Sequence, residues 1–297
     1  MALCSGQPGL PCAARMTAMK PTDMTTTRRG AMLTLAALAA PSVRAQPDED
    51  AALRAAIAGT HRTPAFRARD AARRPYETLR FFGLRPDAKV LELAPGGGWY
   101  TEILAPYLRE RGGLWLAADA RDSAIEYRRR GRAAIEAKLA KKPELYDRVQ
   151  VGTLPADKRF ADITIPGGAD LILTFRSVHN WQADGALDGT LRACHALLKP
   201  GGTLGIVDHR AAAGTTVEAM MKSGYVTEAL MEDSARSAGF TPGGRSEVNA
   251  NPRDTKNHAN GVWSLPPTYA GKDVDRERYA AIGESDRFTH RYLKPLG

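Results

Sequence analysis

Short apolar runs alternate with longer segments of helical periodicity through the middle of the chain. We expect strands at residues 89–93, 114–118, 148–151, 170–175 and 203–207. Helices fit between them, around residues 100–110, 123–140 and 188–198. Strands separated by helices in this way form a parallel sheet with right-handed crossovers. The pattern therefore predicts an α/β fold with a doubly wound sheet, whose ligands gather at the carboxyl ends of the strands.

The flanks of this core follow other patterns. Residues 49–82 read as helices broken at Pro64 and Pro75, which predicts a helical N-terminal preface. After His209 a helical stretch runs to Ser237, and strand signals follow at 246–248 and 287–293. We expect these two strands to add an antiparallel C-terminal hairpin to a mostly parallel sheet. The irregular, proline-bearing segment 249–285 is typical of a functional loop or lid within a compact domain. Residues 46–297 are then one domain.

Residues 1–45 have the layout of a bacterial export signal. Arg28 and Arg29 precede a weakly apolar run at 31–40, and Val43-Arg44-Ala45 resembles a cleavage site. The paired arginines favour the twin-arginine export machinery, which carries folded proteins, and predict a periplasmic or secreted protein. The apolar run is too short to span a bilayer, so we expect no transmembrane anchor after cleavage. Residues before about Met24 add nothing to the signal, which suggests a later start codon.

The charge of the chain does not point to a nucleic-acid-binding function. The chain has 42 basic and 33 acidic residues, and without residues 1–45 the net charge falls from +9 to +5. The densest basic cluster, at residues 128–132, lies in a predicted helix with no aromatic residues interleaved, so we expect a solvated helix face and no nucleic-acid partner. Cys194 is the one cysteine after residue 45, and we expect it to be a buried apolar residue.

The strongest local signal is VLELAPGGGWY at residues 90–100, where a strand carries the acid Glu92 near its end and turns through glycines into a helix. Gly96, Gly97 and Gly98 let the backbone approach a ligand where a Cβ would collide. The amides of a helix N-terminus favour an anionic group, either a dinucleotide pyrophosphate or an amino-acid carboxylate. The loop by itself leaves both ligands open.

Two features separate these ligands. Glu92 would repel a pyrophosphate, whereas it suits the ammonium and sulfonium groups of S-adenosylmethionine. The third glycine of the dinucleotide pattern would fall at Thr101, which is not small enough. The second strand ends at Asp119, 27 positions after Glu92. Nucleotide-binding folds place a carboxylate there that accepts the ribose hydroxyls, and the alternative for Asp119 is a helix cap before Ser123.

These segments resemble class I S-adenosylmethionine-dependent methyltransferases. The resemblance lies in VLELAPGGGWYTEIL, the acid of LAADA, ADLILTF and LLKPGGTLGIVD, and covers about residues 89–208. More narrowly, PGGGWYTEILAPYL, TFRSVHNW, VDHRA, SEVNANPRDT, GVWSLPP and IGESDR resemble a group of bacterial predicted methyltransferases with export signals, from about His61 onward. The resemblance implies a Rossmann-like sheet, S-adenosylmethionine as cofactor, and a small molecule or protein as methyl acceptor. Pro95 departs from the family, which usually has a glycine there.

The resemblance assigns the cofactor to the glycine-rich loop and to the end of the second strand: Glu92, Ala94, Pro95, Gly96, Gly97, Gly98 and Asp119. Acceptor chemistry is expected beyond strands four and five. His179 is our first candidate for a catalytic base and His209 our second, because neutral imidazole accepts a proton near physiological pH. Asp208 and His209 point to opposite sides of a strand, so they need not form a dyad. Each histidine is alternatively a hydrogen-bonded structural residue.

Further acceptor-site candidates follow the same two strands or precede the last one. Arg176, Asn180 and Trp181 come after strand four, and Arg176 and Trp181 suit an anionic or aromatic acceptor, unless they pack at a helix edge. A charged group, Glu284, Asp286 and Arg287, comes just before the last strand of the hairpin pattern, and Asn249, Asn251 and Asp254 follow the previous strand. These residues either line an acceptor site beneath a lid or form helix caps and ion pairs with one another. We expect no metal, because His179, His209 and His258 lack tight ligand spacing.

Two other functions stay open. A nicotinamide-dependent oxidoreductase is disfavoured by Glu92 and by Thr101 at the third glycine position. A non-catalytic exported binding protein that kept the fold gains weight, because export places the chain where S-adenosylmethionine is scarce.

Overall fold

The computed structural model describes residues 50–155 and 159–297, and the proposed export signal lies outside them. Four short helices open the described chain: α1 Ala51–Ala58, α2 Pro64–Arg67, α3 Asp70–Arg73 and α4 Pro75–Phe81. Proline stands at the first position of α2 and α4, where its missing N–H costs no helical hydrogen bond. The predicted helical preface is confirmed.

A Rossmann-like α/β core follows. Its elements are β1 Lys89–Leu93, α5 Thr101–Leu108, β2 Gly113–Ala118, α6 Glu126–Lys141, α7 Pro143–Tyr146, β3 Gln150–Thr153, β4 Ala169–Phe175, α8 Val178–Ala183, α9 Leu187–Leu197 and β5 Leu198–His209. The C-terminal part adds α10 Val217–Ser223, α11 Glu228–Ser237, β6 Thr241–Ser246, the 3₁₀ helix η1 Gly261–Ser264, α12 Arg276–Ile282 and β7 Arg287–Leu293.

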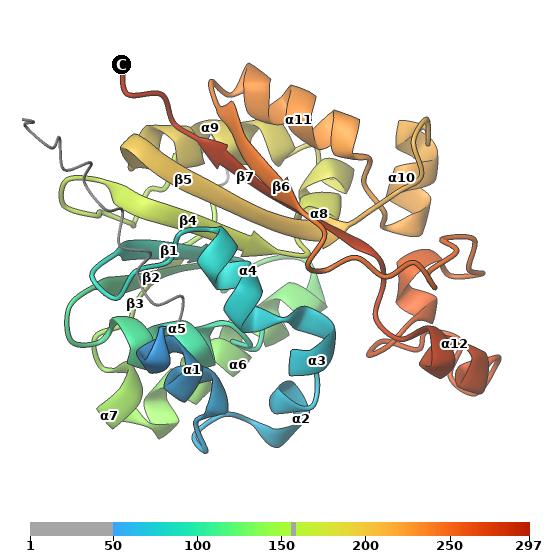
Figure 1. Ribbon diagram of the computed structural model, residues 1–297, viewed down its shortest axis with the longest axis horizontal. Helices are drawn as coiled ribbons and strands as arrows, with labels where there is room; N and C mark the ends of the chain where they lie inside the picture. Colours follow the sequence, from blue (N-terminus) through green and yellow to red (C-terminus); the bar gives the residue numbers. More distant parts are fainter. Residues whose placement is uncertain (1–49, 156–158) are drawn as a thin grey trace, which may run out of the picture. The chain divides into compact units, whose positions relative to one another are not determined.

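The seven strands form one sheet in the order β3-β2-β1-β4-β5-β7-β6. The first five strands pair in parallel, and β7 pairs antiparallel with both β5 and β6 (Figure 1). The prediction of a mostly parallel doubly wound sheet with an antiparallel C-terminal hairpin is confirmed. The strand order reverses between β1 and β4, and in open α/β sheets ligands bind outside the carboxyl ends of the strands at such a point.

Helices cover both faces of the sheet, as Figure 1 shows. Successive residues of β1 enter different cores: Val90 packs with Leu79 and Ile103 from α4 and α5, whereas Leu91 packs with Leu191 from α9 on the other face. The strands are therefore apolar on both faces, which explains their continuous hydrophobic runs. Cys194 lies buried in the second of these cores, as predicted.

Several element boundaries differ from the prediction, and β5, expected at 203–207, runs from Leu198 to His209. β3 begins at Gln150, because Arg148 and Val149 still belong to the turn that follows α7. β6 spans Thr241–Ser246 and not 246–248, since an edge strand tolerates Pro242, whose missing N–H would break a central ladder. The irregular segment 249–285 contains the short helices η1 and α12. In the part of the chain described, no helix is both long enough and apolar enough to cross a membrane.

Candidate functional site

The glycine-rich loop joins β1 to α5 at the carboxyl end of the parallel strands. Ala94, Gly96 and Gly98 have φ values of 50°, 54° and 81°, in the left-handed region that favours glycine. A Cβ placed on Gly96 would point into open space. A Cβ on Gly98 would instead meet the side chain of Ile135 at 2.6 Å, so Gly98 allows the loop to pack against α6. Gly96 thus leaves space next to the loop, whereas Gly98 permits close packing against α6.

A cavity of about 320 Å³ lies against this loop, and we name it the loop cavity. Six of the seven predicted cofactor residues line it: Glu92, Ala94, Pro95, Gly96, Gly97 and Asp119. Gly98 lies outside the lining. Sequence reasoning missed three residues of the N-terminal helices and their linker that cover the cavity, Phe66, Arg69 and Arg73. The sequence spacing of these residues does not predict that they lie near the glycine-rich loop, because only the tertiary fold places α2 and α3 over it.

Glu92 is almost completely buried at the floor of the loop cavity. Its carboxylate accepts a hydrogen bond of 2.7 Å from the Thr101 hydroxyl. Burial raises the pKa of Glu92 to about 7, against the opposing effect of that hydrogen bond. A buried carboxyl with one partner keeps unused acceptor capacity, which a cationic group of a ligand can satisfy.

Asp119 lies just after β2, and its side chain is about a quarter exposed. The nearest cation is the Arg128 guanidinium, whose Nε lies 3.9 Å from the carboxylate. Burial raises the pKa of Asp119, and Arg128 opposes this shift. Its carboxylate makes no hydrogen bond within the described residues, so it is free to accept hydroxyl groups.

A second cavity of about 400 Å³ adjoins the first, and we name it the histidine cavity. His179 and His209 line it together with Glu284, Ser285 and several residues of the irregular segment, Val262, Trp263, Pro266, Pro267 and Thr268. Tyr127, Arg176 and Asn180 line both cavities. The structure therefore places the two predicted histidines next to the predicted cofactor loop, with Arg176 and Asn180 at the junction.

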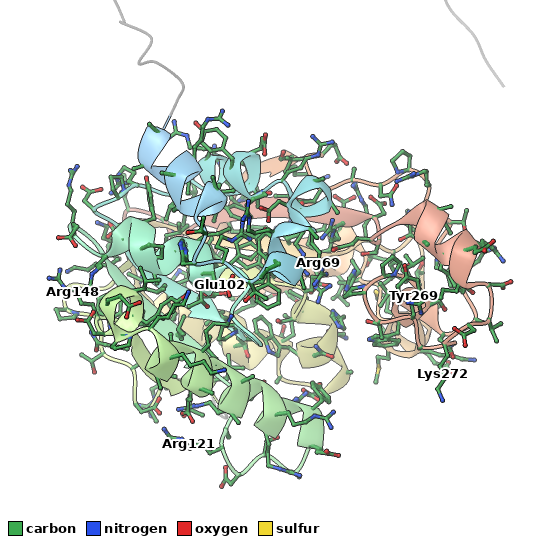
Figure 2. The ribbon with its side chains drawn as sticks, turned by 90° about the horizontal axis from the view of Figure 1, so that it is seen from below. Arg69, Glu102, Arg121, Arg148, Tyr269 and Lys272 are labelled. Carbon is green, nitrogen blue, oxygen red and sulfur yellow. The ribbon has the colours of Figure 1, made fainter. Side chains whose placement is uncertain are left out.

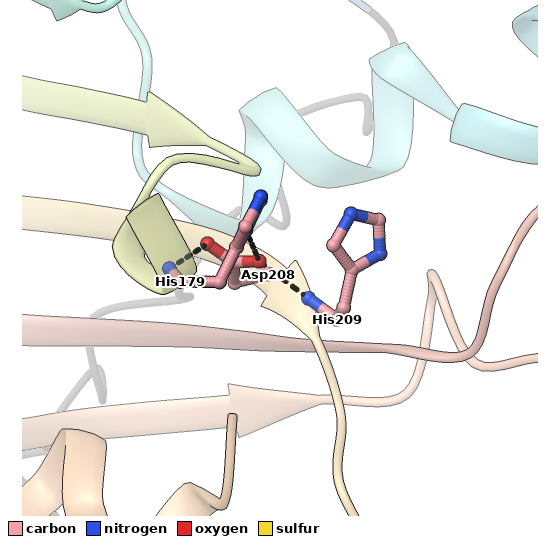
Figure 3. Close-up of side chains that lie close together, drawn as sticks. All are labelled: His179, Asp208 and His209. Carbon is pink, nitrogen blue, oxygen red and sulfur yellow. Dashed lines mark hydrogen bonds and ion pairs between the residues drawn. The ribbon is translucent and has the colours of Figure 1, made fainter. Parts of the chain in front are cut away.

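Asp208 forms a dyad with His179, not with its neighbour His209. Asp208 Oδ1 lies 2.9 Å from Nδ1 of His179 and accepts the His209 backbone N–H at 2.7 Å (Figure 3). Oδ2 accepts the Val178 N–H at 2.6 Å. Asp208 is fully buried, and these bonds fix the ring orientation of His179. With Nδ1 bonded to the carboxylate, Nε2 is the nitrogen left to accept a proton.

His209 has its own partner. Its Nδ1 lies 2.5 Å from the Ser285 hydroxyl, and its ring centroid lies 5.1 Å from that of His179. Burial, assisted by the charges of His179 and Arg176, lowers the pKa of His209 well below its ordinary value. His209 is therefore neutral at physiological pH.

The fold also assembles a group that the sequence spacing did not suggest. Potential metal-ligating atoms of His179, Asp208 and His209 all lie within 4.8 Å of one another. Asp208 already accepts bonds on both oxygens, so coordination would break the contacts that orient His179. The hydrogen bonds of Asp208 would therefore compete with metal coordination at this group.

Glu284 joins distant parts of the chain. Its carboxylate lies 2.6 Å from Nε of Arg69, 3.4 Å from Nε of Arg73 and 3.0 Å from Nη1 of Arg287. Figure 2 shows Arg69 beside the blue N-terminal helices, on the side that faces the C-terminal segment. Burial acts to raise the pKa of Glu284, but the charges of Arg287 and Arg73 outweigh it and lower the pKa to about 2.

Several predicted acceptor residues lie outside the cavity lining. Trp181 faces inward from α8 and packs in the hydrophobic core. Asp286 pairs with Lys256 at 2.9 Å and Arg210 at 3.2 Å, and Arg287 donates to the Ala72 carbonyl. Asp286 and Arg287 are thus held by ion pairs and hydrogen bonds, whereas Glu284 makes such pairs and also lines the histidine cavity.

Asn249, Asn251 and Asp254 likewise anchor the irregular segment. The Asn251 side chain donates to the carbonyls of Ile282 and Glu284. Asp254 is buried and accepts hydrogen bonds from the hydroxyl of Tyr225 and the N–H of Asp286, and His258 Nε2 lies 2.8 Å from it. The indole of Trp263, which the sequence did not single out, reaches the histidine cavity from this anchored segment.

No protein-family model and no curated protein matches the chain. Solved structures do. A SAM dependent methyltransferase from Aquifex aeolicus is 17% identical over 76% of this chain and 93% of its own, with a TM-score of 0.50. The cyclase SpnF is 18% identical over 76% of this chain and 81% of its own, with a TM-score of 0.52.

A third solved structure, described as a candidate sarcosine dimethylglycine methyltransferase from Galdieria sulphuraria, is 16% identical over 78% of this chain and 85% of its own, with a TM-score of 0.51. At these identities the likeness concerns the fold. Together with the strand order, it shows that the chain has the class I S-adenosylmethionine-dependent methyltransferase fold.

Proposed function

We propose that this protein is an S-adenosylmethionine-dependent methyltransferase. The observation that carries the proposal is the pair of adjoining cavities, one against the glycine-rich loop with Glu92 and Asp119, the other lined by the Asp208-oriented His179. The fold is not sufficient support, because folds host many chemistries and this one is shared with a protein described as a cyclase.

The residues of the loop cavity fit S-adenosylmethionine. Gly96 has a positive φ and faces open space that a Cβ would enter. Glu92 offers an under-used buried carboxylate to a cationic group, and Asp119 offers oxygens to ribose hydroxyls. A nicotinamide dinucleotide fits less well, since its pyrophosphate would meet Glu92, and Thr101 occupies the third glycine position with its hydroxyl bonded to that acid.

The cofactor supplies an electrophilic methyl group on a sulfonium. The protein's own part is to position the acceptor and remove its proton, because methyl transfer is an in-line displacement. His179 is held by Asp208 with Nε2 available as the proton acceptor, and Asp208 stabilises the imidazolium that forms. The irregular segment 249–285 covers the histidine cavity through Trp263, Pro266 and Pro267 and limits the access of water.

We also propose that the chain is exported through the twin-arginine route to the periplasm or the cell exterior. Support comes from the sequence at residues 28–45. A folded-state exporter would allow the protein to carry its cofactor out already bound.

Calorimetric titration of residues 46–297 with S-adenosylmethionine, S-adenosylhomocysteine and NAD tests the cofactor assignment. We expect binding of the first two and not of NAD. Asp119→Ala should weaken that binding about ten- to hundredfold, because a charged hydrogen bond contributes roughly 1.5–3 kcal/mol. His179→Ala should leave it unchanged, since His179 lines only the second cavity. Absence of binding by the folded protein would leave the non-catalytic binding protein as the better explanation.

A further inference from the structure

Arg176 occupies an unusual position between the two cavities. It follows β4 with a φ of 61°, a conformation that costs a non-glycine residue about 1 kcal/mol, and its N–H donates to the Val207 carbonyl at 2.7 Å. Its side chain lines both cavities. Among the described residues, no group makes a hydrogen bond or ion pair with its guanidinium. Glu284, the carboxylate with the largest electrostatic effect on it, is already bound by three other arginines.

The charges around Arg176 favour an anion. Burial lowers its pKa to about 10, so it stays positive at neutral pH. Glu284 and Asp208 add negative charge nearby, and Arg69 and Arg287 add positive charge. Arg176, Arg287 and Arg73 also help to keep His209 neutral. The same positive potential opposes a divalent cation at the His179, Asp208 and His209 group. A negatively charged ligand would instead neutralise a guanidinium that is otherwise unpaired.

One part of the histidine cavity wall is apolar, whereas polar and charged residues, among them Arg176, Asn180 and Glu284, form the rest. Trp263, Pro266, Pro267 and Val262 come from the irregular segment, and Tyr127 comes from α6. The Trp263 ring lies 6.3 Å from the His179 ring, edge to face. Such walls suit an aromatic ring, and a cavity of about 400 Å³ suits a small molecule. His179 offers a base to a hydroxyl on that ring.

We propose that the methyl acceptor is a small aromatic hydroxy acid, with its carboxylate paired to Arg176 and its hydroxyl directed at His179. This inference rests on the proposed methyltransferase function. The hydroxyl oxygen uses a lone pair to form the C–O bond with the methyl carbon, and the electron pair of the broken C–S bond stays on sulfur. The hydroxyl proton passes to His179. The products are a methoxy acid and S-adenosylhomocysteine.

Calorimetry with the ortho, meta and para isomers of hydroxybenzoate, each compared with its uncharged hydroxybenzamide, tests the inference. Titrations run with and without saturating S-adenosylhomocysteine. We expect at least one hydroxybenzoate to bind the wild-type protein about tenfold more tightly than its amide, and Arg176→Gln to abolish that preference. Arg176→Lys keeps the positive charge and should therefore keep part of the preference for the acid over the amide. Arg130→Gln, which removes an exposed guanidinium on α6, is the matched control and should behave as wild type.

Three results would overturn the inference. The first is equal binding of hydroxybenzoate and hydroxybenzamide to the wild-type protein. The second is that the wild-type protein binds neither compound. Neither result requires a variant. The third is a loss of S-adenosylhomocysteine affinity in Arg176→Gln with unchanged affinity for methylthioadenosine, which would assign Arg176 to the carboxylate of the cofactor. A preference for hydroxybenzoate without any S-adenosylhomocysteine binding supports the anion site and contradicts the proposed methyltransferase function, so the two failures are distinguishable.

Discussion

Glu92 combines burial with proximity to a ligand cavity, and this combination has an energetic cost in the free protein. Its pKa rises from an ordinary 4.5 to about 7 on folding. A raised carboxyl pKa favours folding only while the group is protonated, so the folded protein loses stability relative to the unfolded chain as the pH rises from about 4.5 through 7. A cationic ligand would offset this loss.

Glu92→Gln should therefore stabilise the ligand-free protein at pH 8. A shift of this size corresponds to about 3 kcal/mol in the free energy of unfolding, and the gain should vanish below pH 4.5. Urea unfolding at the two pH values measures it, with the exposed Glu126→Gln as control. The same variant should bind S-adenosylhomocysteine more weakly. A variant no more stable than wild type at pH 8 would show that Glu92 is well solvated or already paired.

At the residue scale the sequence was most informative where chemistry depends on neighbours in the chain. The acid at the end of a strand, the glycines after it and the next strand's Asp119 all line one cavity because local strand, turn and helix geometry places them. Arg69, Trp263 and Ser285 come from segments without periodicity, and only tertiary packing brings them to the site. Spacing could not predict the pairing of Asp208 with His179, 29 residues away.

At the scale of elements, Glu284 connects the N-terminal helices with the hairpin that carries β7. Arg69 and Arg73 belong to the linker before α3 and to α3 itself, more than 200 residues earlier in the chain. These helices cover the loop cavity, while Ser285, next to Glu284, holds His209 in the histidine cavity. A single carboxylate therefore ties the cover of one cavity to the wall of the other.

Glu284→Gln should destabilise the protein by about 2–3 kcal/mol at neutral pH. The pKa of Glu284 is lowered from 4.5 to about 2, so its contribution is present above pH 4.5 and is lost as the pH falls toward 2. Unfolding by urea at pH 7 and at acid pH measures the difference. Glu247→Gln removes an exposed carboxylate paired with Arg210 and should change stability by less than about 1 kcal/mol. An equal loss in the two variants would mean that the Glu284 cluster is solvated.

Elements with strong periodicity could be predicted, and those defined by packing could not. β7 was expected at 287–293 and lies there. β6 contains Pro242 and two glycines, which argue against a strand in isolation, and it forms because β7 offers a partner at the sheet edge. Helix α8 has six residues and too few turns to show an amphipathic pattern.

At the scale of the whole molecule, the proposed export signal makes a prediction about location. Replacing Arg28 and Arg29 together by lysine should retain the protein in the cytoplasm, because the paired arginines are the feature the twin-arginine route reads. Immunoblots of periplasmic and cytoplasmic fractions from cells that express the full chain measure the distribution. Replacement of Arg44 by lysine, which leaves the pair intact, is the control. Unchanged periplasmic protein after the double replacement would argue for a different route.

The position of β7 between β5 and β6 has a consequence for synthesis on the ribosome. β5 is complete at residue 209, yet its antiparallel neighbour ends at residue 293. At common elongation rates the interval between them takes about 4 to 17 s. During that time the nascent sheet has an open hydrogen-bonding edge, which invites pairing with other chains. The Ser285 partner of His209 arrives in the same late step, so a nascent chain gains the histidine cavity only when the sheet closes.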